Sequence, residues 1–184
     1  NNATVNMRCY YGETCDFGSA SGLSQTGYIF SGGWESGTTG LCSSRTTTFT
    51  ITSTDSTLNY KACKTANTYT ISFDANNGSG GQSTNVTATY GSAMPEISTV
   101  APSRTGYTFM GWYDNASYTS GTQYYTSGGI SSRTWDKTSD TTLYAGWKAN
   151  TYAVQYSCGS GTGTAPSNTS ITYGNTFTPA LNGD

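Results

Sequence analysis

The chain has 184 residues, of which 10% are charged, and its formal net charge is −2. An average protein carries about 25% charged residues, so neither the amount nor the sign of charge favours electrostatic binding to nucleic acid or to an anionic membrane. With 15 Tyr, 4 Trp and no His, the composition favours a β-rich chain that lacks the usual imidazole metal ligand and neutral-pH acid–base group.

The sequence also bears on the redox compartment and on the membrane. Five cysteines without a Cys-x-x-Cys pair favour disulfide formation in an oxidising compartment. No apolar run is long enough to cross a bilayer, so we expect no direct membrane insertion in this segment. Because the sequence begins with Asn1 and not with Met, we expect it to be a processed or excised piece of a longer protein.

Short sequences recur along the chain at a fixed spacing. Ala-Asn-Thr-Tyr at residues 66–69 recurs at 149–152, and Thr-Tyr-Gly at 89–91 recurs at 172–174. Both recurrences have the same offset, 149 − 66 = 83 and 172 − 89 = 83. Two independent matches at one spacing predict an internal repeat. We therefore expect three tandem copies, at residues 1–65, 66–148 and 149–184.

The first copy, residues 1–65, is expected to be incomplete. Thr26-Gly27-Tyr28 matches Thr105-Gly106-Tyr107 of the middle copy at an offset of 105 − 26 = 79. On this alignment the first copy begins with the second strand of the repeat and lacks the opening strand. In its central strand, one extra residue separates Phe30 from Trp34.

Only the middle copy, residues 66–148, is expected to be complete. Large apolar or aromatic side chains alternate with small polar ones, as is typical of strands, at residues 69–73, 85–90, 107–113 and 141–147. The third of these stretches carries large side chains on both faces and should lie inside a sheet. We also expect a short helical turn at residues 93–99, with Pro95 in its first turn.

The patterned strands also predict the core of the middle copy. A buried aromatic side chain removes a large apolar area from water, so we interpret Trp112 and Trp147 as core residues and not as sugar-stacking platforms. The residues that we expect to be buried together are Tyr69, Ile71, Phe73, Phe109, Trp112 and Leu143.

A polar excursion, residues 114–137, separates the central strand from the last strand. It is rich in Ser, Thr and Gly, and it also carries four large aromatic residues, Tyr118, Tyr124, Tyr125 and Trp135. Because ligand-reading loops often have this composition, these side chains are a candidate contact surface for a glycan or a protein. Local packing of the loop is the alternative.

The third copy, residues 149–184, is expected to contain only the opening strands, at residues 152–156 and 169–173. Alternation places Tyr152, Val154 and Tyr156 on one face of the first of these strands. Because no central strand of its own follows, this strand is a candidate for donation to another chain by strand addition. Continuation of the chain at both ends is the alternative.

Three blocks of the middle copy resemble a known family. They are an aromatic opening strand with an Asn-Asn-Gly turn at residues 69–78, Gly-Tyr-Thr-Phe-Met-Gly-Trp-Tyr at 106–113 and Leu-Tyr-Ala-Gly-Trp at 143–147. The pattern resembles the Listeria–Bacteroides repeat, also called the internalin B-repeat. The resemblance implies mainly β domains of the α+β β-grasp (ubiquitin-like) class, arranged in tandem in bacterial surface proteins as stalk, spacer or adhesive modules.

This chain departs from the family's pattern in two places. The excursion makes the middle copy longer than a typical repeat, and Cys63 stands near the place of the closing Trp in the first copy. The resemblance therefore does not predict how side chains pack around the closing strand of the first copy.

Four of the five cysteines fall in the first copy: Cys9, Cys15, Cys42 and Cys63. We interpret them as two disulfides that stabilise a domain with a small core, and the sequence does not choose among the three connectivities that four cysteines allow. Zinc would need tighter ligand spacing. Cys158 is left over, and we expect its partner beyond Asp184 or on another chain.

No motif in the chain favours catalysis. The ten carboxylates are scattered, whereas a glycosidase needs two that face each other, and a chain without His has no Ser–His dyad. We therefore expect no enzyme activity, no cofactor, no metal site and no nucleic-acid partner.

These observations predict an extracellular structural or adhesive segment of a bacterial cell-surface protein. One alternative is a filament subunit assembled head to tail by strand addition, and another is a glycan- or protein-binding module that uses the excursion aromatics. A hydrolase whose catalytic domain lies outside this sequence is a further alternative. The expected partners are other copies or repeats of the same protein, or a glycan or protein of a host or neighbouring cell.

Overall fold

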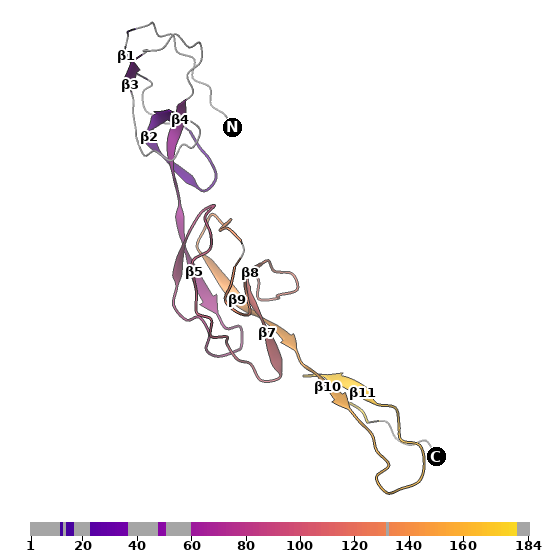
Figure 1. Cartoon of the computed structure of the whole chain (residues 1–184). Helices are drawn as coiled ribbons and strands as arrows, with labels where there is room; N and C mark the ends of the chain where they lie inside the picture. Colours follow the sequence, from indigo (N-terminus) through magenta and orange to yellow (C-terminus); the bar gives the residue numbers. More distant parts are fainter. Residues whose placement is uncertain are drawn as a thin grey trace. The chain divides into compact units, whose positions relative to one another are not determined.

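The computed structural model of the chain describes residues 12, 14–16, 23–36, 48–50, 60–131 and 133–179. Within these residues every regular element is a β-strand and no helix occurs, so this part of the chain is mainly β with several small sheets (Figure 1). Two compact units can be distinguished: residues 1–69 with 87–93 and 134–140, and residues 70–86, 94–133 and 141–184.

The largest sheet has five strands and belongs to the middle copy. Its strands are β5 (Thr68–Asp74), β6 (Val86–Thr89), β7 (Tyr107–Tyr113), β8 (Gln123–Thr126) and β9 (Thr141–Ala149), and their order is β6-β5-β9-β7-β8. The first and last strands, β5 and β9, are parallel neighbours at the centre, whereas β7 is antiparallel to both β9 and β8. The strand that carries large side chains on both faces, β7, lies inside the sheet as predicted.

The other sheets are antiparallel pairs. They comprise β1 (Thr14–Asp16) with β3 (Thr48–Thr50), β2 (Tyr28–Ser36) with β4 (Tyr60–Ala66), and β10 (Thr151–Val154) with β11 (Thr169–Thr172). A two-stranded sheet is marginally stable by itself in water, so each pair depends on contacts outside its own ladder.

The β2–β4 pair repeats the register of the β7–β9 pair. Tyr28 and Trp34 of β2 lie opposite Ala66 and Ala62, just as Tyr107 and Trp112 of β7 lie opposite Ala149 and Ala145. A β-bulge interrupts each pair, between Phe30 and Trp34 in one and between Phe109 and Gly111 in the other. Four steps along β2, from Phe30 to Trp34, span two steps of β4, whereas three steps along β7, from Phe109 to Trp112, span two steps of β9. The larger irregularity of the first pair holds its extra residue.

This register also places the closing strand of the first copy. Phe30 lies opposite Lys64, whereas Phe109 lies opposite Trp147. Lys64 therefore stands where the middle copy has its closing Trp, and Cys63, which is fully buried, is one residue earlier.

The predicted core of the middle copy is confirmed in its central members. Ile71 and Leu143 are fully buried and Trp112 is 2% exposed, whereas Tyr69, Phe73 and Phe109 are half-buried. Trp112 meets the rings of Phe73 and Phe109 edge-on at centroid distances of 5.1 and 5.5 Å, an arrangement that aromatic pairs favour. Trp147 is also buried, and its indole N–H donates a hydrogen bond to Ala75 O at 3.0 Å.

The strand predictions agree with the structure to within two residues, and β7 agrees at both ends. The helical turn predicted at residues 93–99 is wrong, because these residues form no helix. Their polar groups are engaged elsewhere: the N–H of Met94 donates to Arg133 O at 3.4 Å, and the hydroxyl of Tyr125 donates to Pro95 O at 2.7 Å. These contacts hold the segment beside the excursion in an irregular conformation.

Candidate functional site

Two long strand runs pass from one copy of the repeat into the next through a single asparagine. Only Asn67 separates β4 from β5, and only Asn150 separates β9 from β10 (Figure 1). We call the surroundings of these two residues the Asn67 junction and the Asn150 junction. All residues of the Asn67 junction lie in the first compact unit, and all residues of the Asn150 junction lie in the second.

At the Asn67 junction the backbone of one residue joins two ladders. The N–H of Asn67 donates to Gly27 O at 2.8 Å, which extends the β2–β4 ladder by one bond. The carbonyl of Asn67 accepts from the N–H of Tyr90 at 2.9 Å, and Tyr90 directly follows β6. Asn67 is thus the residue that connects the β2–β4 ladder with the segment after β6.

The Asn150 junction makes the same two bonds. The N–H of Asn150 donates to Gly106 O at 2.9 Å, and its carbonyl accepts from the N–H of Tyr173 at 2.8 Å. Each asparagine precedes its tyrosine by the same interval (90 − 67 = 23 and 173 − 150 = 23). These bonds use only backbone groups, so they do not depend on the side chain of the asparagine.

Each junction glycine lies against the ring of the junction tyrosine. Gly27 and Gly106 have φ angles of +78° and +80°, which L side chains rarely adopt. A Cβ atom at Gly27 would overlap the ring of Tyr90, and one at Gly106 would overlap the ring of Tyr173. Glycine is therefore required at both positions for two separate reasons, backbone conformation and space.

A second tyrosine and a cation complete each junction. Tyr90 meets Tyr28 edge-on at 5.6 Å and 80°, and Tyr173 meets Tyr107 at 5.5 Å and 74°. The Lys64 ammonium lies 4.4 Å from the ring centroid of Tyr28. At the other junction the Arg104 guanidinium lies 4.0 Å from the ring centroid of Tyr107. Both distances are within the range of a cation–π interaction.

The two junctions differ at the asparagine side chain. Asn150 Oδ1 accepts a hydrogen bond from the Thr108 hydroxyl at 2.7 Å. At the Asn67 junction the position of Thr108 is taken by Ile29 (108 − 29 = 79), which has no hydroxyl, and Asn67 Oδ1 is buried without a hydrogen-bond partner. The other end of the amide is engaged, since Asn67 Nδ2 donates to the Tyr69 hydroxyl at 3.2 Å.

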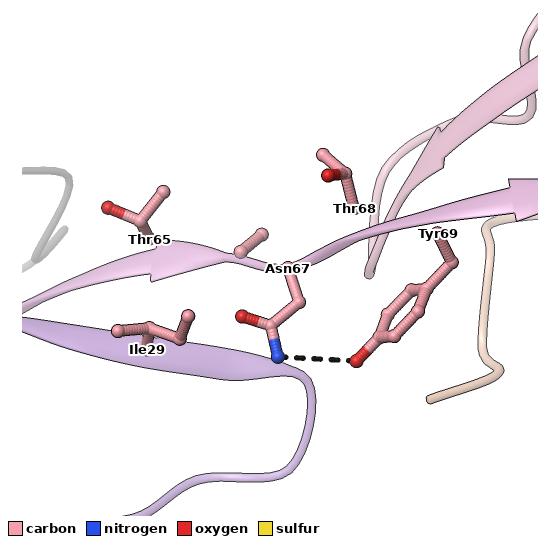
Figure 2. Close-up of a pocket in the computed structure, with 6 residues that line it drawn as sticks. Ile29, Thr65, Asn67, Thr68 and Tyr69 are labelled. Atoms are coloured by element: carbon pink, nitrogen blue, oxygen red, sulfur yellow. Dashed lines mark hydrogen bonds between the residues drawn. The ribbon is translucent and has the colours of Figure 1, made fainter. Parts of the chain in front are cut away.

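A shallow hollow lies at the Asn67 junction. Its lining consists of Ile29, Thr65, Ala66, Asn67, Thr68 and Tyr69. Figure 2 shows Asn67 and Tyr69 reaching toward each other on one side of the strand run, while Thr65 and Thr68 point to the other side. The polar groups of this lining are the threonine hydroxyls, the Asn67 amide and the Tyr69 phenol.

The excursion aromatics are placed differently from the prediction. Tyr124 and Tyr125 are each 1% exposed and Trp135 is fully buried. Tyr124 and Tyr125 lie in β8, and the Arg133 guanidinium covers the ring of Tyr124 at 4.8 Å. A ring that solvent does not reach cannot stack on a glycan, so the contact surface predicted from these three residues is wrong and they belong to the core.

Tyr118 is the one member of the predicted contact surface that is not buried. It is half-buried, and its ring packs edge-on against Tyr113 at 5.7 Å. Burial raises the pKa of Tyr113, and the neighbouring Tyr118 raises it further. Burial alone raises the pKa of Tyr125 to about 12.

The described cysteines fall into two kinds. Cys15 and Cys63 are buried and disulfide-bonded, and Cys158 is free and exposed. Cys9 and Cys42 lie outside the described residues, so the two-disulfide arrangement of the first copy stays a prediction. The thiol of Cys158 donates to Gly163 O at 3.5 Å, within the loop between β10 and β11.

The predicted donated strand corresponds to β10. Tyr152 and Val154 lie in this strand, and Tyr156 lies two residues past its end. Tyr152 is 47% exposed. The strand pairs with β11 in a two-stranded sheet, whereas its counterpart β5 lies between β6 and β9.

Metal ligation and membrane crossing were the remaining possibilities for the described residues. No group of three or more Cys, Asp or Glu side chains is placed to hold a metal ion in this part of the chain. The same residues contain no helix of the length and apolar character that crossing a membrane requires.

Residues 69–146, which comprise most of the five-stranded sheet, match the profile of the Listeria-Bacteroides repeat domain family. This segment is a Listeria–Bacteroides repeat domain. The family points to bacterial surface proteins. The matched range ends within β9, just before the Asn150 junction.

Two proteins of Evansella cellulosilytica are similar to the chain. One, named "Putative membrane protein", is 35% identical over 112 residues, which cover 61% of this chain and 15% of that protein. The other, named "Putative Gly-rich membrane protein", is 36% identical over 100 residues, 52% of this chain and 10% of that protein. The chain thus spans a small part of these much longer relatives. No solved structure matches the chain.

Proposed function

We propose that this chain is a structural segment of a bacterial cell-surface protein, in which tandem repeats act as an extracellular spacer or stalk. The repeated junction supports this proposal most strongly. One backbone geometry recurs at Asn67 and at Asn150, and a geometry that can be repeated indefinitely is what a chain of modules needs. The match to a family of surface repeats adds to it.

The repeats themselves are proposed to be β-grasp domains. Numbered within the middle copy, the strand order β6-β5-β9-β7-β8 becomes 2-1-5-3-4 with strands 1 and 5 parallel, the arrangement of a β-grasp sheet. The segment between β6 and β7 takes the place of the helix in that fold. The register of β2–β4 and the pairing of β10–β11 support incomplete first and third copies at residues 1–65 and 149–184.

Spacer function requires no chemistry, and we propose that the segment is not an enzyme and uses no cofactor. Its partners in this proposal are neighbouring repeats of the same protein. An adhesive role is less supported, since Tyr124, Tyr125 and Trp135 are buried and offer no aromatic surface to a glycan.

Surface display can be tested in the producing bacterium with an epitope inserted at Gly80, a position with open space around it. Antibody should label intact cells, and surface proteolysis should remove the label. A second strain would lack residues 67–149, so that Asn150 directly follows Ala66 in the position of Asn67. We expect this in-phase deletion to preserve display and to bring the outer part of the protein closer to the cell. Labelling only after lysis would contradict the proposal.

A second candidate function is assembly of a filament by strand addition. The observation that favours it is the free side of β10, since β10 pairs with β11 alone in the described residues. In this proposal β10 is donated to another chain as an added strand, and the exposed Cys158 thiol allows an interchain disulfide. Electron microscopy and non-reducing electrophoresis of the purified chain test it. Monomers at every concentration, with Cys158 free, would exclude the filament.

A further inference from the structure

We propose that Gly106, Tyr107 and Asn150 form a docking seat for the opening hairpin of the following repeat, and that this seat couples consecutive repeats mechanically. The occupant is the β10–β11 hairpin with Tyr173 at its end. The equivalent seat in the first unit comprises Gly27, Tyr28 and Asn67, and its occupant is Tyr90. Docking of the hairpin does not depend on display at the cell surface. The docking proposal can therefore be wrong while the proposed spacer function is correct.

The hairpin is held at two points and not by its covalent tether alone. Asn150 ties it to Gly106 through a backbone bond of 2.9 Å, and Tyr173 returns to Asn150 through another of 2.8 Å. Residues 151–172 form the loop that these two ends close, with β10 and β11 inside it. A linker of one residue with both of its backbone polar groups engaged has little freedom to rotate.

Side-chain packing adds to these backbone bonds. The ring of Tyr173 lies over Gly106 and edge-on to Tyr107, and Tyr173 still has 41% of its surface exposed. Because Tyr173 is partly exposed, its substitution does not remove a side chain from the core. The buried part depends on the absence of a Cβ atom at Gly106.

The cation at each seat has a different origin in the sequence. Arg104 lies two residues before Gly106 and covers Tyr107 directly. The equivalent position in the first copy is Gln25 (104 − 25 = 79), whose side-chain oxygen accepts a hydrogen bond of 2.8 Å from the Lys64 ammonium, and Lys64 covers Tyr28. Two different residues thus supply the same positive charge over the same tyrosine.

The compact units divide as a docked hairpin predicts. Residues 87–93, which include Tyr90, group with the first copy and not with the sheet that contains β5. The β10–β11 hairpin likewise groups with the middle copy. The end of the first hairpin that carries Tyr90 therefore groups with the preceding copy, whereas residues 70–86, with most of β5, group with the middle copy's own sheet.

The test uses the full chain and four variants. Gly106→Ala places a Cβ atom where the Tyr173 ring lies, and Tyr173→Ala removes the ring itself. Gly174→Ala is the matched control for Gly106→Ala, because Gly174 has a similar φ of +86° but nothing within 4 Å of a Cβ atom. Tyr173→Phe keeps the ring and is the matched control for Tyr173→Ala.

Two readouts separate docking from folding. Residual dipolar couplings report whether residues 151–172 and the sheet of β5, β7 and β9 share one alignment, and hydrogen exchange reports protection of the Tyr173 amide. We expect shared alignment in the parent and in both controls. We expect its loss in Gly106→Ala and Tyr173→Ala, with at least about tenfold faster exchange of the Tyr173 amide and unchanged exchange in β5 and β9.

Two results would overturn the proposal. One is independent alignment of the hairpin in the unmodified chain. The other is equal behaviour of Tyr173→Ala and Tyr173→Phe, which would show that the ring makes no contribution even if Gly106→Ala fails to fold.

Discussion

Asn67 and Asn150 stand in the recurring sequence Ala-Asn-Thr-Tyr and make the same pair of backbone hydrogen bonds, to a glycine that precedes them in the chain and from a tyrosine that follows. Their side chains, in contrast, have different partners. Asn150 Oδ1 accepts from Thr108, whereas Asn67 Oδ1 is buried without a partner. The backbone of the junction is thus common to both positions, and its side-chain contacts are not.

Supplying the missing hydroxyl should stabilise the Asn67 junction. Ile29→Thr places a hydroxyl where Thr108 has one, and the exposed Ile29 side chain contributes little core packing. A hydrogen bond that satisfies a buried acceptor is worth about 1 kcal/mol or more, so the midpoint of urea unfolding of the first unit should rise.

Ile29→Val is the control, since it keeps the β-branch and adds no hydroxyl. The reverse change, Thr108→Ile, should destabilise the Asn150 junction by about 0.5–1.5 kcal/mol because it removes the exposed hydrogen bond to Asn150 Oδ1. Equal unfolding midpoints for Ile29→Thr and Ile29→Val would show that the Asn67 oxygen already has a partner, such as water.

The core of the repeat domain should depend strongly on Trp112. This side chain is 2% exposed and contacts Phe73 and Phe109. Trp112→Ala should cost roughly 3–5 kcal/mol through lost burial and the cavity that remains. Ile130→Ala is the control, because Ile130 is 70% exposed and should change the free energy of unfolding by less than about 0.5 kcal/mol. Equal melting temperatures for the two variants would contradict the core assignment.

Stability should fall at alkaline pH because of Tyr125. Its pKa is raised to about 12 in the folded chain, above the value of about 10 for an unperturbed tyrosine. Between these values the unfolded chain loses the proton and the folded chain keeps it, so unfolding becomes more favourable as pH rises. The stabilisation is complete below about pH 10 and is lost by about pH 12, to the extent of roughly 1–2 kcal/mol once solvent screening is allowed for.

Unfolding at a series of pH values measures this effect. Tyr125→Phe should lower stability at neutral pH by about 1 kcal/mol, through loss of the bond to Pro95, and should weaken the dependence between pH 10 and 12. An unchanged slope in this variant would assign the alkaline effect to other tyrosines.

Thiol labelling should distinguish the cysteines of the native chain. Cys158 is free and exposed, whereas Cys15 and Cys63 are buried and disulfide-bonded. We expect a thiol reagent to modify Cys158 alone, and reduction to increase hydrogen exchange in residues 1–65 while residues 66–148 change little. Reaction of all five cysteines in the native protein would refute the disulfide interpretation.

The sequence predicted those elements whose side chains carry a periodic pattern. Strand β7 was predicted at both ends because large residues alternate on two faces and Gly106 marks its start. Strand β8 was missed because it is short and lies among Ser, Thr and Gly. Its adjacent tyrosines, Tyr124 and Tyr125, are both buried. Because adjacent residues of a strand point to opposite faces, both faces of β8 are covered by other parts of the fold, which a local sequence pattern does not show.

The junctions were visible in the sequence only as a repeat. Ala-Asn-Thr-Tyr recurs at the start of the next copy, but the two hydrogen bonds of each asparagine involve backbone atoms, which no residue type specifies. The available signal was a pair of glycines, Gly27 and Gly106, each placed before a strand that begins with tyrosine. Without the structure these glycines read as ordinary turn residues.

The most direct test of the junction is the detection of its hydrogen bonds by through-bond scalar couplings in the labelled full chain. We predict couplings from the Asn67 and Asn150 amides to the carbonyls of Gly27 and Gly106, and from the Tyr90 and Tyr173 amides to the two asparagine carbonyls. Absence of all four couplings, in a sample that shows the couplings between β7 and β9, would contradict the claim that one asparagine links each copy to the next.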